Sequence, residues 1–214
     1  SYHVVVGGHA FVNNLVAGES ARNASGDRAS SVVTVEDEAE VRNLYLAGDV
    51  CNTKELVVNC SGGKIVNVLP RRSGKTGTVE RVVFRLADPD CLPEEFGDGI
   101  APDVINEKTL SIFGKGELRT GSLGGWDVIV EADAEIHVPG TWNADTLRVE
   151  EGATLYLDSD FVSQVPEYSG AGRVILAPGA VPQPDPDPEP KPDPKPDPKP
   201  DPNPIPSHGS GAGT

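Results

Sequence analysis

Apolar and polar residues alternate through the second half of the chain, and this alternation recurs at a nearly constant interval. In the first series of segments, the apolar pairs are Leu110 and Ile112, Val128 and Val130, Leu147 and Val149, and Val174 and Leu176. The second series comprises Leu118, Ile136 and Leu155. A period of two indicates a β-strand with one buried face. The stretch from Thr109 to Leu176 therefore predicts pairs of short strands.

One such pair is too small to bury its apolar face alone, and stacking of similar units solves this problem. Equivalent positions recur every 18 or 19 residues, apart from a longer last step. Turn-forming residues separate the two strands of each unit, namely Gly114-Lys115-Gly116, Ala132-Asp133 and Glu151-Gly152. We therefore predict an all-β fold, a parallel β-solenoid (β-helix-like) that is followed by an extended polyproline II tail.

Less regular strands of the same kind precede this stretch. We expect them at 2–6, 11–16, 32–35, 41–46, 56–58, 64–69 and 79–86. The predicted organisation has an N-terminal segment at 1–31, which caps the solenoid or contacts another subunit, and the solenoid itself at 32–181. An insertion at 87–107 interrupts the repeats, and insertions in solenoids form loops that often lie on the binding face.

Proline occupies every second position from Pro182 through Pro194 to Pro206. Proline fixes its own φ and pushes the preceding residue toward extended geometry, so this segment predicts a polyproline II rod. A rod of this kind acts as a spacer. The last residues, 207–214, are expected to be flexible.

The chain carries a net charge of −15, with 37% hydrophobic and 5% aromatic residues. This acidic balance excludes nucleic acid and anionic membrane surfaces as partners, because both need clustered Lys and Arg. No apolar run is long enough for a membrane-spanning helix. Because Met is absent even from position 1, we expect Ser1 to be the product of cleavage and the protein to be exported to the cell surface.

Three cysteines make an odd count. Cys51 and Cys60 flank the apolar residues 56–58, which favours a disulfide between them and leaves Cys91 free or in an intermolecular bond. The alternative is three ordinary buried thiols.

Carboxylates gather in the insertion. Asp88, Asp90, Glu94, Glu95 and Asp98 offer the oxygen ligands that Ca²⁺ prefers. Their spacing differs from that of an EF-hand loop, and an ordinary acidic loop is the alternative. We expect no other cofactor.

Motifs that carry catalysis are missing from the sequence. The four histidines lack metal-ligand spacing, and there is no Gly-x-Ser-x-Gly nucleophile elbow. Ser73-Gly-Lys-Thr76 resembles the end of a phosphate-binding loop, but Leu69 stands where that motif needs glycine. No catalytic residue is therefore assigned.

The outward-facing rows of the repeats are better candidates for a binding surface. If the repeats stack in register, Arg119, His137 and Tyr156 form one ladder. A second outward ladder comprises Thr109, Asp127, Thr146 and Arg173. Trp126 and Trp142 occupy corresponding strand borders. Aromatic and hydrogen-bonding side chains on a flat face suit contact with carbohydrate or protein, and a solvated polar face is the alternative.

The units at 130–138 and 149–157 resemble the coils of bacterial cell-surface β-solenoids, such as autotransporter passengers and haemagglutinin-like adhesins. The proline-rich segment is similar to the spacers of such surface proteins. This resemblance implies an extracellular, adhesive role and assigns no catalytic residue.

Two functions follow. The first is a non-enzymatic extracellular structural or adhesive protein, including a self-assembling subunit of a filament or surface layer that is linked through its proline-rich tail. Its partners would be further copies of itself, or surface glycans and proteins. The alternative is a carbohydrate-active β-helix enzyme or a phage tail-type glycan-binding protein. A groove with two carboxylates spaced for glycoside hydrolysis would favour that alternative.

Overall fold

The computed structural model describes residues 2–18, 30–93, 96–97, 100, 103–119, 123–139, 144–157 and 168–176. The chain divides into two compact units, Ser1–Pro182 and Gln183–Thr214, and every described residue belongs to the first. The predicted polyproline II tail, with Pro182, Pro194 and Pro206, and the predicted flexible end lie outside the described residues.

The fold is all-β, and every pair of neighbouring strands is parallel. The strands are β1 (Tyr2–Val6), β2 (Phe11–Val16), β3 (Ser30–Val35), β4 (Glu40–Tyr45), β5 (Asn52–Cys60), β6 (Lys64–Leu69), β7 (Thr78–Leu86), β8 (Ile105–Ile112), β9 (Lys115–Glu117), β10 (Trp126–Val130), β11 (Glu135–Val138), β12 (Thr146–Val149), β13 (Thr154–Leu157) and β14 (Arg173–Leu176). A short 3₁₀ helix, η1 (Pro89–Cys91), follows β7.

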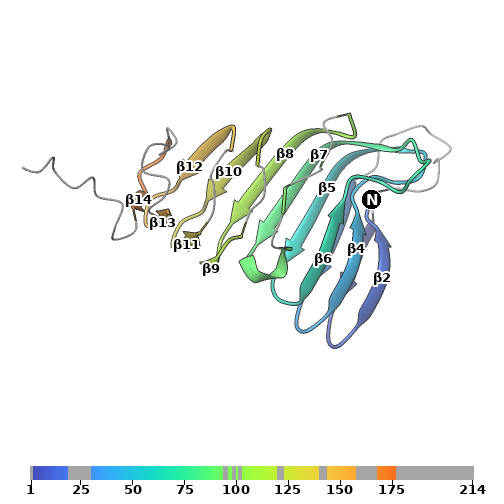
Figure 1. Ribbon diagram of the computed structural model, residues 1–214, viewed down its shortest axis with the longest axis horizontal. Helices are drawn as coiled ribbons and strands as arrows, with labels where there is room; N and C mark the ends of the chain where they lie inside the picture. The colour runs from blue at the N-terminus through green and yellow to red at the C-terminus, as the bar shows by residue number, and fades with distance from the viewer. Residues whose placement is uncertain are drawn as a thin grey trace, which may run out of the picture. The chain divides into compact units, whose positions relative to one another are not determined.

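Most successive strands alternate between sheets, as Figure 1 shows. The exceptions are β7 and β8, which η1 separates along the chain, and β13 and β14. One sheet has seven strands in the order β1-β3-β5-β7-β8-β10-β12. The strands between them form a three-stranded sheet, β2-β4-β6, and a four-stranded sheet, β9-β11-β13-β14. The helix η1 contacts both β6 and β9, so it occupies the interval between the two smaller sheets.

Several of the predicted strands are present with the predicted bounds. The predicted strands 2–6, 11–16 and 64–69 match β1, β2 and β6. In the repeats, Leu110 pairs with Val128 and Val128 with Leu147, as predicted for the first series.

The register of the last unit differs from the prediction. Val174 pairs with Leu155, and Leu176 with Leu157, so both belong to the second row and not the first. Within the described part of this unit, the first row is represented by an isolated bridge between Arg148 and Ser169.

The register of β9 also differs. Gly116 pairs with Ile136, which was predicted to lie beside Leu118. Leu118 follows β9, and its N–H donates to the His137 carbonyl at 2.8 Å, so Leu118 continues the strand by one inward position. The sequence did not indicate this register, because Gly116 stands opposite Ile136, where an apolar residue was expected.

A shared turn leads from one sheet to the next. The pattern Val-Glu-x-x-Ala recurs at 35–39, 130–134 and 149–153. In each copy the alanine is buried, and its N–H donates to the glutamate carbonyl three residues earlier. Each copy also has one residue with positive φ. Asp133 and Gly152 immediately precede the alanine, whereas Asp37 lies two residues before it. Aspartate and glycine are the residue types that tolerate this geometry.

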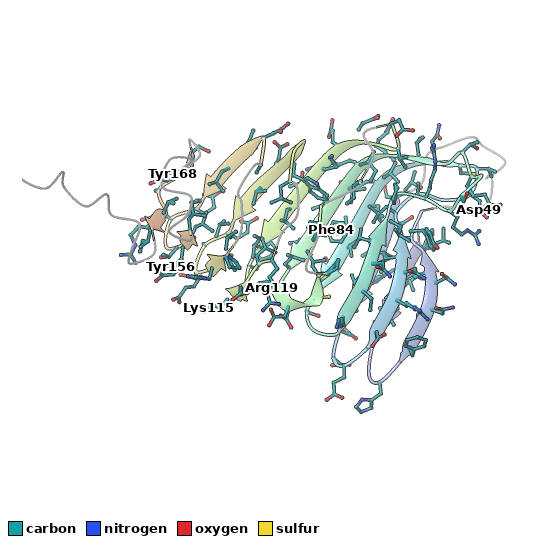
Figure 2. The ribbon with its side chains drawn as sticks, viewed as in Figure 1. Asp49, Phe84, Lys115, Arg119, Tyr156 and Tyr168 are labelled. Atoms are coloured by element: carbon teal, nitrogen blue, oxygen red, sulfur yellow. The ribbon has the colours of Figure 1, made fainter. Side chains whose placement is uncertain are left out.

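The core consists of inward rows of Val, Leu and Ile between the facing sheets. Its largest buried side chains include an aromatic cluster of Phe84, Phe96 and Trp126, whose ring centroids lie 5.0 to 6.0 Å apart. Phe84 comes from the middle of the seven-stranded sheet (Figure 2). Phe96 comes from the insertion at 87–107, so part of that segment fills the core.

Three asparagines form a ladder along the three-stranded sheet. Asn43 Nδ2 donates to Asn14 Oδ1, and Asn67 Nδ2 donates to Asn43 Oδ1, each at 3.0 Å. Each donor also reaches a backbone carbonyl of the preceding strand, at Asn13 or Arg42. This ladder fixes the register of β2, β4 and β6, because a shift by one residue would break every bond in it.

Candidate functional site

The outer face of the four-stranded sheet carries the row in which a contact surface was predicted. Glu117, His137, Tyr156 and Ile175 stand in register across β9, β11, β13 and β14. His137 and Tyr156 are therefore neighbours as predicted, and their ring centroids are 5.9 Å apart. Arg119 was predicted in this row, but Glu117 occupies its place because β9 is registered two residues earlier.

The row borders a shallow hollow of about 600 Å³. We call it the aromatic face, and it is lined by Lys115, Gly116, Glu117, Glu135, His137 and Tyr156. Figure 2 shows Lys115, Arg119 and Tyr156 at the same end of the strands. Gly116 belongs to the inward row with Ile136, and a Cβ at Gly116 would meet the ring of Pro89 in η1. The outward side chains of its neighbours therefore border the hollow.

Charges on the aromatic face are paired with one another. Lys115 Nζ lies 3.2 Å from Glu135 Oε2, and Arg119 Nε lies 2.7 Å from Glu117 Oε1. The Tyr156 hydroxyl donates to Glu135 Oε1 across 3.5 Å, a long hydrogen bond. The face thus presents two rings and several hydrogen-bonding groups with balanced charge.

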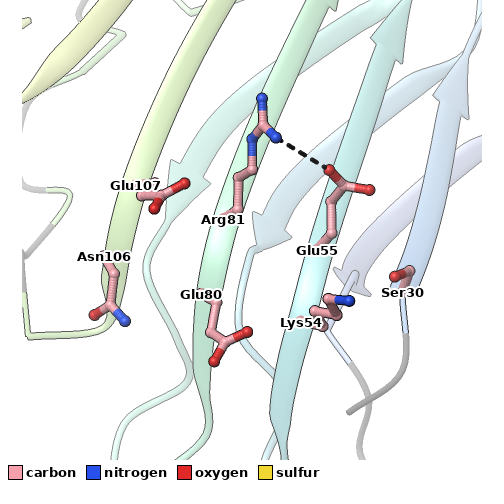
Figure 3. A pocket seen from close by; sticks show the side chains of 7 residues that line it. All are labelled: Ser30, Lys54, Glu55, Glu80, Arg81, Asn106 and Glu107. Carbon is pink, nitrogen blue, oxygen red and sulfur yellow. Dashed lines mark ion pairs between the residues drawn. The ribbon is translucent and has the colours of Figure 1, made fainter.

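A second hollow, of about 560 Å³, lies on the outer side of the seven-stranded sheet (Figure 3). In β5, β7 and β8, two polar residues stand between two buried ones, at 53–56, 79–82 and 105–108. Strict alternation would place one residue there, so all three strands carry a bulge at the same level. The bulges turn Glu55, Arg81 and Glu107 into one row.

This second hollow has mixed charge. Its further lining residues include Lys54, Glu80 and Asn106. Arg81 Nη1 lies 3.9 Å from Glu55 Oε1, and both side chains are partly exposed. An exposed pair at this distance contributes little to stability, so the hollow is a polar surface feature.

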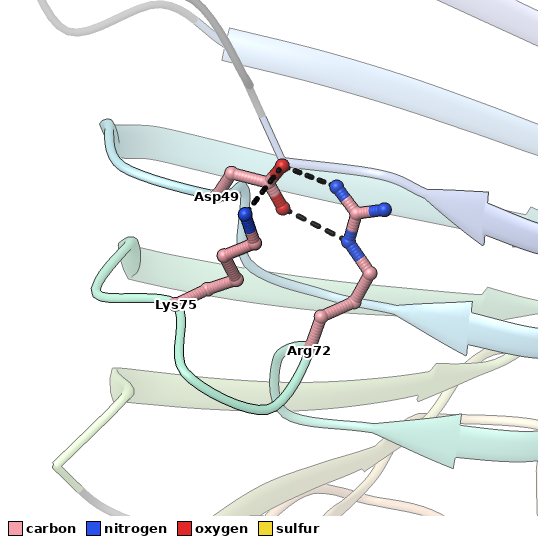
Figure 4. Close-up of polar contacts among 3 residues, drawn as sticks. All are labelled: Asp49, Arg72 and Lys75. Carbon is pink, nitrogen blue, oxygen red and sulfur yellow. Dashed lines mark hydrogen bonds and ion pairs between the residues drawn. The ribbon is translucent and has the colours of Figure 1, made fainter.

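In the segment that resembles a phosphate-binding loop, the basic side chains of Arg72 and Lys75 are paired with the carboxylate of Asp49 (Figure 4). Arg72 donates through Nε to Asp49 Oδ1 at 2.9 Å and through Nη2 to Asp49 Oδ2. Lys75 Nζ lies 3.6 Å from the same carboxylate. The hydrogen bond from Arg72 lowers the pKa of Asp49 below its ordinary value. These contacts give the loop a structural role.

The two predicted tryptophans do not extend the contact surface. Trp126 is fully buried in the aromatic cluster, which corrects the prediction. Trp126 lies two residues before Val128 and four before Val130, so it points to the same inward face of the strand. The alternation in the sequence could have indicated this. Trp142 lies outside the described residues. In the second predicted ladder, Thr109, Asp127 and Thr146 pair as expected, whereas Arg173 pairs with Thr154 in the other sheet.

The predicted calcium ligands are only partly described. Asp88 caps η1, and its Oδ1 accepts the Asp90 N–H at 3.0 Å. Glu94, Glu95 and Asp98 lie outside the described residues. Within the described ranges, no group of three or more His, Cys, Asp or Glu is placed to hold a metal ion. Calcium binding stays a prediction.

The disulfide predicted between Cys51 and Cys60 is wrong. Cys51 immediately precedes β5 and Cys60 ends it, so an extended strand holds the two apart. At ~3.3 Å per residue this separation is about 30 Å, whereas a disulfide needs Cα atoms within about 7 Å.

Comparisons with family models, with curated proteins and with solved structures find no match. The part of the chain that the structure describes contains no helix of the length and apolar character needed to cross a membrane.

Proposed function

We propose that this chain is a non-enzymatic extracellular protein with a structural or adhesive role, built as a β-solenoid that acts through surface contact. The alternation of successive strands between parallel sheets supports the solenoid. From β1 to β13, each turn of the chain adds one strand to the seven-stranded sheet, followed by one strand of a smaller sheet or by η1. A stack of this kind gives rows of identical spacing on its outer faces, which suits repeated contact with an extended partner.

The observation that carries the proposal is the adjacency of His137 and Tyr156 on the aromatic face. Ring faces pack against the C–H groups of a sugar, while hydroxyl and carboxylate groups beside them satisfy its hydroxyls. The ion pairs of Lys115 and Arg119 leave little net charge on the face. We therefore propose a neutral glycan as the partner of the aromatic face.

Self-association is supported by the strands that end the sheets. Among the described residues, β1 and β2 are edge strands, and edge strands can serve as templates for pairing with another chain. They also expose apolar side chains, Val5 at 53% and Phe11 at 61%. We propose that this end and the proline-rich segment at 182–206 connect subunits in an assembly.

Glycan binding tests the role of the aromatic face. The purified chain is applied to an array of neutral and acidic glycans, beside Tyr156→Ala and His137→Ala variants. Tyr168→Ala is the matched control, because Tyr168 is 43% exposed and stands apart from Tyr156 on the ribbon (Figure 2).

We expect binding of a neutral glycan that falls at least tenfold in the two variants of the aromatic face and is unchanged in the control. Equal binding by all four proteins would contradict the assignment of the surface. Release of sugar fragments by the unmodified chain would contradict a non-enzymatic role.

A further inference from the structure

Cys60 and Cys91 come together in the core although they lie far apart in the sequence. The Cys60 carbonyl accepts the N–H of Ala87 at 2.8 Å and that of Asp88 at 3.2 Å. The Cys91 N–H donates to the Asp88 carbonyl at 3.3 Å. Both cysteines are thus bonded to the backbone of Asp88, so η1 holds Cys91 beside the end of β5.

The two side chains face each other inside the core. Cys60 is 1% and Cys91 0% exposed. A hydrogen bond between the two thiols, together with burial, raises the pKa of Cys60 well above its ordinary value. Cys51 is half-buried and stands at the other end of β5.

We propose that Cys60 and Cys91 form a disulfide bond in the oxidised protein, and that Cys51 remains a free thiol. The bond would join the end of β5 to η1, which is the one helical segment among the described residues. It would thereby fasten the helix that occupies the interval between β6 and β9. The odd cysteine count then resolves into one buried pair and one single thiol.

The oxidant is a small-molecule disulfide. One cysteine thiolate attacks it, which forms a mixed disulfide and releases one small thiol. The second cysteine thiolate attacks the protein sulfur of the mixed disulfide, so the intramolecular bond forms and the second small thiol leaves. The protein loses two electrons and two protons, and the oxidant is reduced to two thiols. Because both cysteines are buried in the fold, we expect this exchange to occur during folding.

The bond itself depends only on the geometry of β5 and η1. Its persistence in the organism rests on the proposed extracellular location, since reducing compartments keep such pairs as thiols. A test on purified protein therefore separates the pairing from the proposed function. Glycan binding can fail while the disulfide forms, and the reverse also holds.

The test uses the full chain, reduced in denaturant and refolded with a mixture of reduced and oxidised glutathione. Free thiols are alkylated in denaturant without reductant, and the digested peptides are identified by mass spectrometry. We expect a cross-linked pair of peptides that contain Cys60 and Cys91, and alkylation at Cys51. In Cys51→Ser the same cross-link should form, and reductant should lower the unfolding temperature of this variant.

A Cys91→Ser variant serves as a negative control, in which no intramolecular cross-link to Cys60 forms. Should that variant fail to fold, the reduced and oxidised forms of Cys51→Ser make the same comparison without altering the buried pair. Alkylation of all three cysteines in chains that have regained their β-sheet circular dichroism would overturn the proposal. A cross-link that contains Cys51 would also overturn it.

Discussion

The ring of Phe96 lies edge-on against that of Phe84, with centroids 5.0 Å apart and an interplanar angle of 68°. Phe84 belongs to β7, whereas Phe96 comes from an acidic, proline-containing segment that carries little sign of a core residue in the sequence. This segment also contributes the buried residues Leu92, Ile100 and Val104. The insertion therefore closes part of the core, besides any role on the surface.

The burial of Phe96 yields a stability prediction. Phe96→Ala removes a fully buried ring from the aromatic cluster, and we expect it to lower the free energy of unfolding by about 3–5 kcal/mol. Urea denaturation followed by circular dichroism measures the loss. Phe113→Ala is the control, because Phe113 is 40% exposed and contacts the Arg85 guanidinium. Its loss should stay below about 1 kcal/mol. Equal losses in both variants would contradict the packing described for the insertion.

The asparagine ladder gives a second prediction. Asn43→Asp keeps an acceptor for Asn67 but loses the N–H groups that bond Asn14 and Asn13. We expect this change to cost about 1–3 kcal/mol of unfolding free energy. Asn13→Ala retains the carbonyl that Asn43 contacts, so it is the matched control and should change stability less. Thermal unfolding of both variants tests the ladder, and a fully stable Asn43→Asp would show that it does not secure the register.

The ion pair of Asp49 and Arg72 predicts a pH dependence. The pKa of Asp49 is lowered in the folded chain, chiefly by its hydrogen bond from Arg72. Ionised Asp49 therefore stabilises the fold at pH values above its ordinary pKa of 3.8, and this contribution is lost as the pH falls through the lowered value. Asp49→Asn should be less stable than the unmodified chain at neutral pH, and the difference should shrink toward about pH 2.

Unfolding temperatures across this pH range measure the effect. Asp103→Asn is the control, since Asp103 is largely exposed in its pair with Arg71. Exposed pairs of this kind add little stability, so this control should follow the unmodified chain. A difference between Asp49→Asn and the unmodified chain that is constant with pH would contradict the assigned ion pair.

Much of the fold could be predicted from alternation alone, because a period of two marks both the strand and its inward face. The parity that places Val128 and Val130 in the core also places Trp126 there. The register of β9 could not be read in the same way, since Gly116 takes the position of an apolar residue opposite Ile136. In the last unit, the longer step before Val174 was a sign that this residue had changed rows.

The aromatic face was predicted in part. His137 and Tyr156 follow from the repeats, but Glu117 replaced Arg119 once the strands were paired. The hollow on the seven-stranded sheet was missed. It arises because three strands bulge at the same level, and a bulge looks like an interruption of the pattern when each strand is viewed alone.

We propose that this protein assembles and acts through its surfaces. Negative-stain electron microscopy of the full chain, beside a chain that ends at Val181, shows whether each of them assembles. We expect ordered filaments or sheets from the full chain, and single particles with unchanged β-sheet circular dichroism from the shortened one. Identical assemblies in both samples would contradict the role of the proline-rich segment, and single particles in both would contradict self-assembly.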